Sequence, residues 1–234
     1  MKHFINIKDV PYKTLRKILS DTKKRKDLRK KLKTLEIDKD NPLKGILLIQ
    51  MFEKSSLRTR LSFYLAIRQL GGSALTLRPD ELHLSKGGES LSDTAKILST
   101  YGDIFVLRTD NEKKLNSFKK FLSIPLINGL SPNSHPTQIL SDIFTIEEIT
   151  KKNISRLNIC WIGDSNNVLN SLIEASIKFS FKLNIGCPKN YNPGSEMLRM
   201  IRQKSSKIKI FNNPKVAIKN ADVVLTDKVI SMND

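Results

Sequence analysis

The chain has 234 residues, of which 39% are hydrophobic, and its formal net charge at pH 7 is +18. This length and composition are typical of one large or two modest globular domains, and they exclude a disordered chain. No apolar run reaches the roughly 18 residues of a membrane helix, and no apolar block follows the N-terminal charges, so we expect a cytoplasmic protein without a membrane partner.

A basic helix is predicted first, over residues 11–35. Its cations are densest at 23–33 and fit the exposed side of a helix whose apolar residues include Leu28, Leu32 and Leu35. A nucleic acid, a membrane surface or a phosphorylated small molecule would suit the overall charge. A lysine-rich solvated surface is the explanation that we prefer, and we expect no nucleic-acid partner.

Strands and helices then alternate. Residues 45–52 (GILLIQMF) form a continuous apolar run, which is typical of a strand buried on both faces. Residues 56–70 follow as a helix that Ser56 can cap and two glycines end. A glycine-containing loop is expected at 84–89. The other elements of this half are strands at 73–77, 104–108 and 125–128 and helices near 92–101 and 112–122.

A helix at 136–150 with proline in its first position leads to a second alternation. The predicted strands are 157–163, 182–187, 207–211 and 222–227, and the predicted helices are 166–180, 195–204 and 214–220. Such alternation indicates an α/β fold with two doubly wound parallel-sheet domains joined by a helix. We place a first domain at 1–134, the linking helix at 135–150 and a second, incomplete domain at 151–234.

The strongest local signal for chemistry is FEKSSLRTR at 52–60, where a buried strand ends and a helix begins with hydroxyls and arginines. The first N–H groups of a helix have no intrahelical partner, and the helix dipole is positive there. Ser56 and Thr59 add hydroxyl groups, and Arg58 adds a guanidinium suited to a phosphate. The pattern predicts an anion site, although a serine cap followed by surface arginines has the same sequence.

FEKSSLRTRLSF closely resembles the Ser-x-Arg-Thr-Arg carbamoyl phosphate motif of the aspartate/ornithine carbamoyltransferases. Residues 135–138 (HPTQ) resemble the family's His-Pro-x-Gln motif, and Arg108 ends a strand where the family has a third phosphate-side arginine. Residues 161–167 (WIGDSNN) and 227–232 (DKVISM) resemble the ornithine branch. These motifs occur in the family's order over almost the whole chain.

The resemblance implies carbamoyl transfer from carbamoyl phosphate to the δ-amine of ornithine, giving citrulline and phosphate, in arginine biosynthesis or the arginine deiminase route. It implies a homotrimer, no metal and no organic cofactor. The first domain would bind carbamoyl phosphate and the second ornithine. The implied carbamoyl phosphate residues are Ser56, Leu57, Arg58, Thr59, His83, Arg108, His135 and Gln138, with Arg108 and His135 catalytic, and the implied ornithine residues are Asn167, Asp227, Ser231 and Met232.

The sequence departs from the family pattern in three places. Leu57 stands where the family has threonine, and Pro132 stands where it has aspartate. The family's later His-Cys-Leu-Pro segment has no counterpart; Cys160 and Cys187 do not match its cysteine and are expected in the core. An inactive, truncated remnant that at most binds carbamoyl phosphate is therefore an alternative, as are aspartate, putrescine or acetylornithine as the acceptor.

Overall fold

The computed structural model describes residues 3–81 and 90–227. Contacts divide the chain into two compact units, Met1–Ile5 with Lys17–Pro132 and Asn6–Arg16 with Asn133–Asp234. The segment Asn6–Arg16, which the sequence analysis placed in the first domain, therefore makes most of its contacts with the second. Among the described residues, no helix combines the length and hydropathy needed to cross a membrane.

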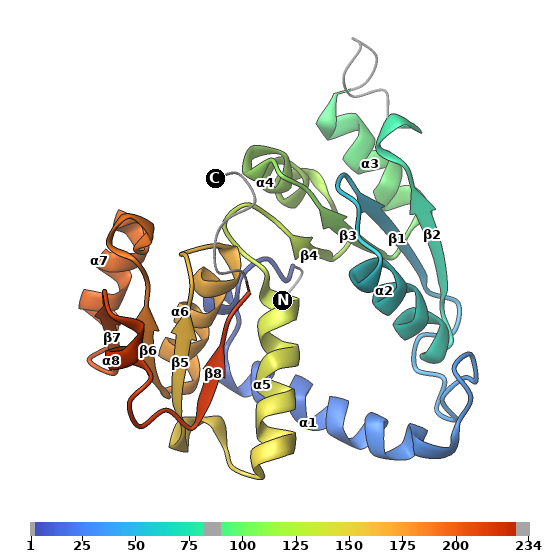
Figure 1. Ribbon diagram of the computed structural model, residues 1–234. Helices are drawn as coiled ribbons and strands as arrows, with labels where there is room; N and C mark the ends of the chain where they lie inside the picture. Colours follow the sequence, from blue (N-terminus) through green and yellow to red (C-terminus); the bar gives the residue numbers. More distant parts are fainter. Residues whose placement is uncertain (1–2, 82–89, 228–234) are drawn as a thin grey trace. The chain divides into compact units, whose positions relative to one another are not determined.

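The first unit contains a four-stranded parallel sheet (Figure 1). Its strands are β1 (Leu47–Phe52), β2 (Ser73–Leu77), β3 (Ile104–Arg108) and β4 (Leu126–Leu130), in the order β2-β1-β3-β4. The chain runs outward from β1 to β2 and then returns to β3 on the other side of β1. The topology therefore reverses between β1 and β3, and ligands of doubly wound sheets bind at the carboxyl ends of such a strand pair.

Helices cover both faces of this sheet (Figure 1), which explains why β1 is buried along most of its length and, apart from Gln50, apolar. On one face, α2 (Arg58–Gln69) packs through Ile67. On the other face lie α3 (Leu91–Tyr101) and α4 (Glu112–Phe121). The buried side chains of the larger core cluster are Ile5, Ile49, Met51, Ala95, Leu98, Phe105, Leu107, Leu115, Phe118, Leu122 and Leu126.

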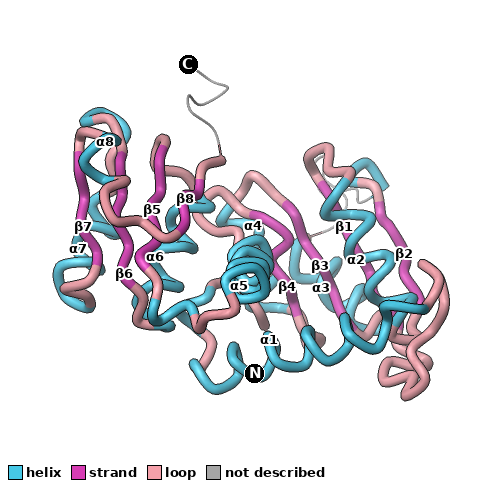
Figure 2. Tube along the Cα trace, turned by 60° about the horizontal axis from the view of Figure 1, so that its bottom comes forward, coloured by secondary structure: helices cyan, strands magenta, loops and turns pink. Residues whose placement is uncertain are grey.

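The second unit repeats the architecture, and Figure 2 shows its four strands side by side. These strands are β5 (Asn158–Ile162), β6 (Lys182–Gly186), β7 (Ile208–Phe211) and β8 (Val223–Leu225), all parallel, in the order β7-β6-β5-β8. Its topology reverses between β5 and β8. The helices are α5 (Pro136–Thr150), α6 (Asn167–Phe179), α7 (Ser195–Lys204) and α8 (Pro214–Ala217).

Short 3-10 helices complete the described elements. They are η1 (Ile7–Asp9), η2 (Arg29–Lys31), η3 (Pro79–Glu81), η4 (Ile154–Arg156) and η5 (Lys189–Tyr191). The segment containing η1 is fixed to α6, because the carboxylate of Glu174 accepts the backbone N–H of Lys8 at 3.1 Å and pairs with its ammonium at 3.4 Å. This pairing explains the place of Asn6–Arg16 in the second unit.

The first helix is shorter than predicted, which corrects the expectation of a helix over 11–35. α1 spans Tyr12–Leu28 and passes into η2. The guanidinium of Arg29 donates to the carbonyls of Lys33 and Glu36, so the chain turns back on itself instead of continuing the helix. Leu28 is 76% exposed and Leu35 is 57% exposed, so the apolar face predicted for them is also wrong.

The α/β fold with two parallel sheets is confirmed. The helices predicted at 136–150 and 195–204 have the observed bounds of α5 and α7, and Pro136 occupies the first turn of α5. Cys160 and Cys187 are both buried, as expected. The loop predicted at 84–89 lies outside the described residues.

Candidate functional site

The start of α2 and the end of β3 lie together at the strand pair where the first sheet reverses. In the β1–β3 register Phe52 is opposite Arg108, and the backbone N–H of Glu53 donates to the carbonyl of Arg108 at 2.9 Å. Both parallel strands end at the same edge, so the loop leading to α2 passes beside the Arg108 side chain. Sheet register thus brings together residues that lie about fifty positions apart in the sequence.

Arg108 is the central cation of this edge. One terminal nitrogen of its guanidinium donates to the hydroxyl of Ser56 at 3.2 Å and approaches that of Thr59 at 3.5 Å. Its Nε atom is buried without a hydrogen-bond partner, and no carboxylate of the described residues pairs with it. Burial lowers the pKa of this guanidinium below its usual value. A partly buried cation without a counterion is suited to an anionic ligand.

Ser56 does not cap α2, which corrects the sequence expectation. The helix begins at Arg58, and the N-cap position belongs to Leu57, whose side chain makes no cap hydrogen bond and is 68% exposed. The first helical bond runs from the N–H of Leu61 to the carbonyl of Leu57, which leaves the preceding first-turn N–H groups outside the helical ladder. Ser56 instead accepts from Arg108.

The acidic and basic residues that flank Arg108 are already paired. Glu53 accepts hydrogen bonds from the hydroxyl of Thr109 and from the ammonium of Lys114. Lys54, exposed, pairs with Asp110 at 3.5 Å. Because the negative charge of Glu53 is offset by Lys114, it does not cancel the positive charge of Arg108.

In the second unit, the HPTQ segment is held by α6. The backbone N–H of His135 donates to the hydroxyl of Ser171 at 2.9 Å, and the same hydroxyl lies 3.1 Å from that of Ser134. The His135 ring is largely buried, with Nδ1 3.4 Å from the hydroxyl of Thr137. Gln138 follows on the exposed side of the first turn of α5.

A second polar group lies where the β5–β8 topology reverses. Asn166 caps α6, because its side-chain oxygen accepts the N–H groups of the first turn, and its Nδ2 donates to the carboxylate of Asp227 at 3.0 Å. Asn167 is the first residue of α6. The carboxylate of Asp227 is exposed and therefore accessible to a ligand ammonium group.

Asn166 is the residue that sequence reasoning missed at this edge. The paired asparagines pointed to Asn167, but an asparagine directly before an amphipathic helix is also the standard N-cap signal. That signal identifies Asn166 as the residue with a fixed side chain, and the parallel register of β5 and β8 brings it to Asp227. His83, Ser231 and Met232 lie outside the described residues.

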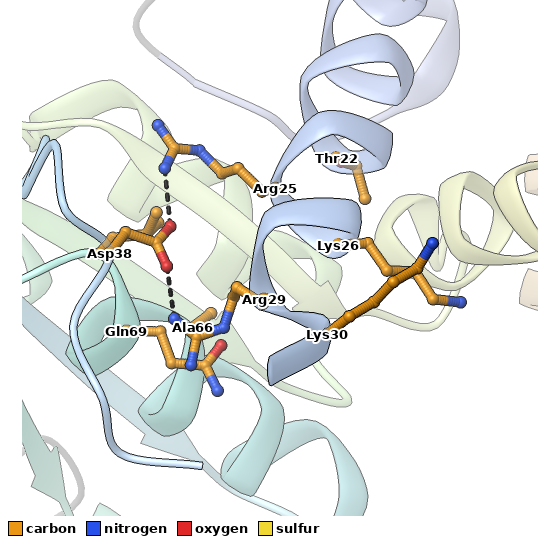
Figure 3. A pocket seen from close by; sticks show the side chains of 9 residues that line it. Thr22, Arg25, Lys26, Arg29, Lys30, Asp38, Ala66 and Gln69 are labelled. Atoms are coloured by element: carbon orange, nitrogen blue, oxygen red, sulfur yellow. Dashed lines mark hydrogen bonds and ion pairs between the residues drawn. The ribbon is translucent and has the colours of Figure 1, made fainter. Parts of the chain in front are cut away.

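A hollow at the other end of α2 from Ser56 gathers none of the predicted site residues (Figure 3). Arg25 and Arg29 converge there on the buried carboxylate of Asp38, with a distance of 2.7 Å from Arg25. Arg25 also pairs with Asp40 at 3.0 Å. The carboxylates compensate the two arginines, and the cluster fastens the end of α1 to the loop before β1.

Comparison with known proteins identifies both halves of the chain. Residues 2–148 match the carbamoyl-P binding domain of the aspartate/ornithine carbamoyltransferases, and residues 155–234 match the Asp/Orn binding domain. The ornithine carbamoyltransferases of Rhizorhabdus wittichii and Caulobacter vibrioides are each 39% identical to this chain over the aligned residues. The alignments cover 99% and 100% of this chain and 74% of each relative.

Solved structures agree. The anabolic ornithine carbamoyltransferase of Campylobacter jejuni is similar with a TM-score of 0.85 and 34% identity, covering 100% of this chain and 75% of the other. The ornithine carbamoyltransferase of Pyrococcus furiosus has a TM-score of 0.90 and 33% identity, covering 99% and 73%. This chain thus spans about three-quarters of the relatives' length. The motifs, both sheets and these relatives together show that the chain belongs to the aspartate/ornithine carbamoyltransferase family, whose members are carbamoyltransferases.

Proposed function

We propose that this protein transfers the carbamoyl group of carbamoyl phosphate to the δ-amine of ornithine, giving citrulline and phosphate. The observation that carries the proposal is Arg108, a partly buried guanidinium with no carboxylate partner among the described residues, directed at Ser56 and Thr59. A phosphate oxygen would complete its hydrogen bonds and supply the missing negative charge. The relatives named for this reaction support the same conclusion.

In the proposed reaction, the neutral δ-amine attacks the carbonyl carbon of carbamoyl phosphate. A C–N bond forms, the C–O bond to phosphate breaks, and one amine proton is released. Thr59, Arg108 and His135 stabilise the negative charge that develops on the carbonyl oxygen. Ser56, Arg58, Thr59 and the first-turn N–H groups of α2 hold the departing phosphate.

The second domain would recognise the amino acid acceptor. Asp227, held by Asn166, pairs with the α-ammonium of ornithine, and Ser231 and Met232 follow it in the chain. Asn167 binds the α-carboxylate, and Gln138 binds the carbamoyl amide. Orienting the two substrates supplies much of the rate, because it replaces a bimolecular encounter by a fixed geometry.

The test combines turnover with binding. The 234-residue chain is incubated with carbamoyl phosphate and ornithine, and citrulline is measured colorimetrically; aspartate, putrescine and acetylornithine serve as alternative acceptors. Phosphonoacetamide, in which CH2 replaces the bridging oxygen of carbamoyl phosphate, is titrated calorimetrically. Citrulline formation supports the proposal. Binding without turnover supports the inactive carbamoyl phosphate-binding alternative. The absence of both binding and turnover refutes the proposal and this alternative.

We further propose a cytoplasmic homotrimer that acts in arginine biosynthesis or the arginine deiminase route. The support is the resemblance to the ornithine branch of the family. Light scattering after size-exclusion chromatography measures the mass, and a particle with the mass of one chain would contradict the trimer.

A further inference from the structure

Glu53 and Arg108 carry opposite charges, and their backbones are hydrogen-bonded to each other. The N–H of Glu53 donates to the carbonyl of Arg108 at 2.9 Å. A carboxylate and a guanidinium that are both withdrawn from water normally compensate each other. Glu53 nevertheless pairs with Lys114, and Arg108 has no carboxylate partner in the part of the chain that the structure describes. The fold therefore keeps the two side chains apart.

Side-chain alternation places them on opposite faces of the first sheet. Phe52 and Arg108 are opposite each other in the β1–β3 register, and Phe52 packs in the core cluster beneath α2. Glu53 and Thr109 are the next residues of their segments, so their side chains point to the other face, where α4 lies. There the carboxylate of Glu53 accepts from the hydroxyl of Thr109 and from the ammonium of Lys114 on α4.

The first turn of α4 fixes the position of Lys114. Its backbone N–H donates to the side chain of Asn111, the N-cap residue, at 3.0 Å, and the N–H of Asn111 donates to the hydroxyl of Thr109 at 3.0 Å. That hydroxyl donates in turn to Glu53, which closes a ring of hydrogen bonds from the end of β3 to α4 and back. Both oxygens of the Glu53 carboxylate, whose side chain is 13% exposed, therefore have a donor within this ring.

Resting on the function proposed above, we infer that Lys114 is a positioning residue that keeps Arg108 available to carbamoyl phosphate by holding the Glu53 carboxylate on the α4 face. Without the ammonium of Lys114, Glu53 would be a partly buried carboxylate with a single neutral donor, and pairing with Arg108 would compensate its charge. The guanidinium would then have an internal counterion that a phosphate must displace. Lys114 itself touches no substrate, because it acts through Glu53.

The test is the affinity of the 234-residue chain for phosphonoacetamide, titrated calorimetrically at one ionic strength and below the melting temperature of each variant. Lys114→Met should weaken binding roughly 10- to 100-fold, which corresponds to one hydrogen bond to a charged group. Lys113→Met is the matched control, because it removes one positive charge from the exposed side of the same helical turn. It should change the affinity by less than about twofold, since an exposed charge is screened by solvent.

Glu53→Gln distinguishes this role from that of a purely structural support. The neutral amide can still accept from Thr109 but offers Arg108 no counterion, so this variant should bind at least as tightly as the unaltered chain. The double variant Glu53→Gln/Lys114→Met should recover the affinity that Lys114→Met loses. If the ring only supports the loop before α2, Glu53→Gln should weaken binding and the double variant should bind no better than Lys114→Met.

Either of those two results overturns the inference. Unchanged affinity of Lys114→Met also overturns it, as does an equal loss in Lys113→Met, because the total charge of α4 would then explain the effect. Failure of the unaltered chain to bind phosphonoacetamide would instead refute the proposed function, and the inference with it.

Discussion

Replacing Leu57 by threonine should strengthen carbamoyl phosphate binding. Leu57 occupies the N-cap position of α2, is 68% exposed and supplies no hydrogen bond there. The family motif has threonine at this position, and its hydroxyl would donate to a charged phosphate oxygen. Such a bond is worth about 1.5–3 kcal/mol net, which corresponds to an affinity gain of roughly 10- to 100-fold. Folding stability should change by only about 0.5 kcal/mol, because little of the leucine is buried.

The matched control is Leu57→Val, since valine has the shape of threonine with a methyl in place of the hydroxyl. Dissociation constants for phosphonoacetamide are measured calorimetrically for all three chains at one ionic strength, because exposed charges are screened by salt. The threonine chain should bind more tightly than the valine chain by the stated factor. Equal affinities of these two chains would show that the hydroxyl does not reach the ligand and would refute the reasoning.

Three further outcomes are expected. Arg108→Gln should weaken phosphonoacetamide binding about 100-fold or more by removing charge-assisted bonds, without lowering the melting temperature; retained affinity would place the anion elsewhere. Burial raises the pKa of the Glu174 carboxyl above 4.5, so the folded state binds its proton more tightly than the unfolded state does. The resulting stability is present below pH 4.5 and is lost as pH rises through the raised pKa. Glu174→Gln should remove that loss when urea unfolding curves are measured over a pH series; an unchanged pH profile would contradict this. Gly102→Ala places a Cβ 2.6 Å from Ile49 Cδ1 and should cost about 1–3 kcal/mol of unfolding free energy. Gly194→Ala, with nothing within 4 Å of its Cβ, should cost less, because it loses only the preference of the α7 N-cap for glycine over alanine; equal costs would count against the packing argument.

Local patterns sufficed for most of the fold. The run at 45–52 is apolar on both faces because helices cover both sides of β1, and that requirement is visible in the sequence alone. Proline in the first turn marked the start of α5. The prediction failed at the end of α1, where the long-range bonds of Arg29 to later carbonyls stop a helix that its own composition would continue.

The candidate site also has features that local sequence predicts and features that depend on long-range contacts. The sequence alone predicted an anion site at the start of α2, since hydroxyls and arginines after a buried strand are a local feature. The β1–β3 register decided that the Ser56 hydroxyl accepts a hydrogen bond from Arg108 instead of capping the helix. The bond from Asn166 to Asp227 depends likewise on β5 and β8 being neighbours.

By itself, the sequence determined most of the elements, the α/β class and the chemical types available at each strand end, because periodicity and motifs act over a few residues. Only the tertiary structure decided which of those groups meet. The partners of Arg108 and Asp227 come from segments about fifty and sixty residues away, and no local pattern encodes which strands lie side by side or in which register.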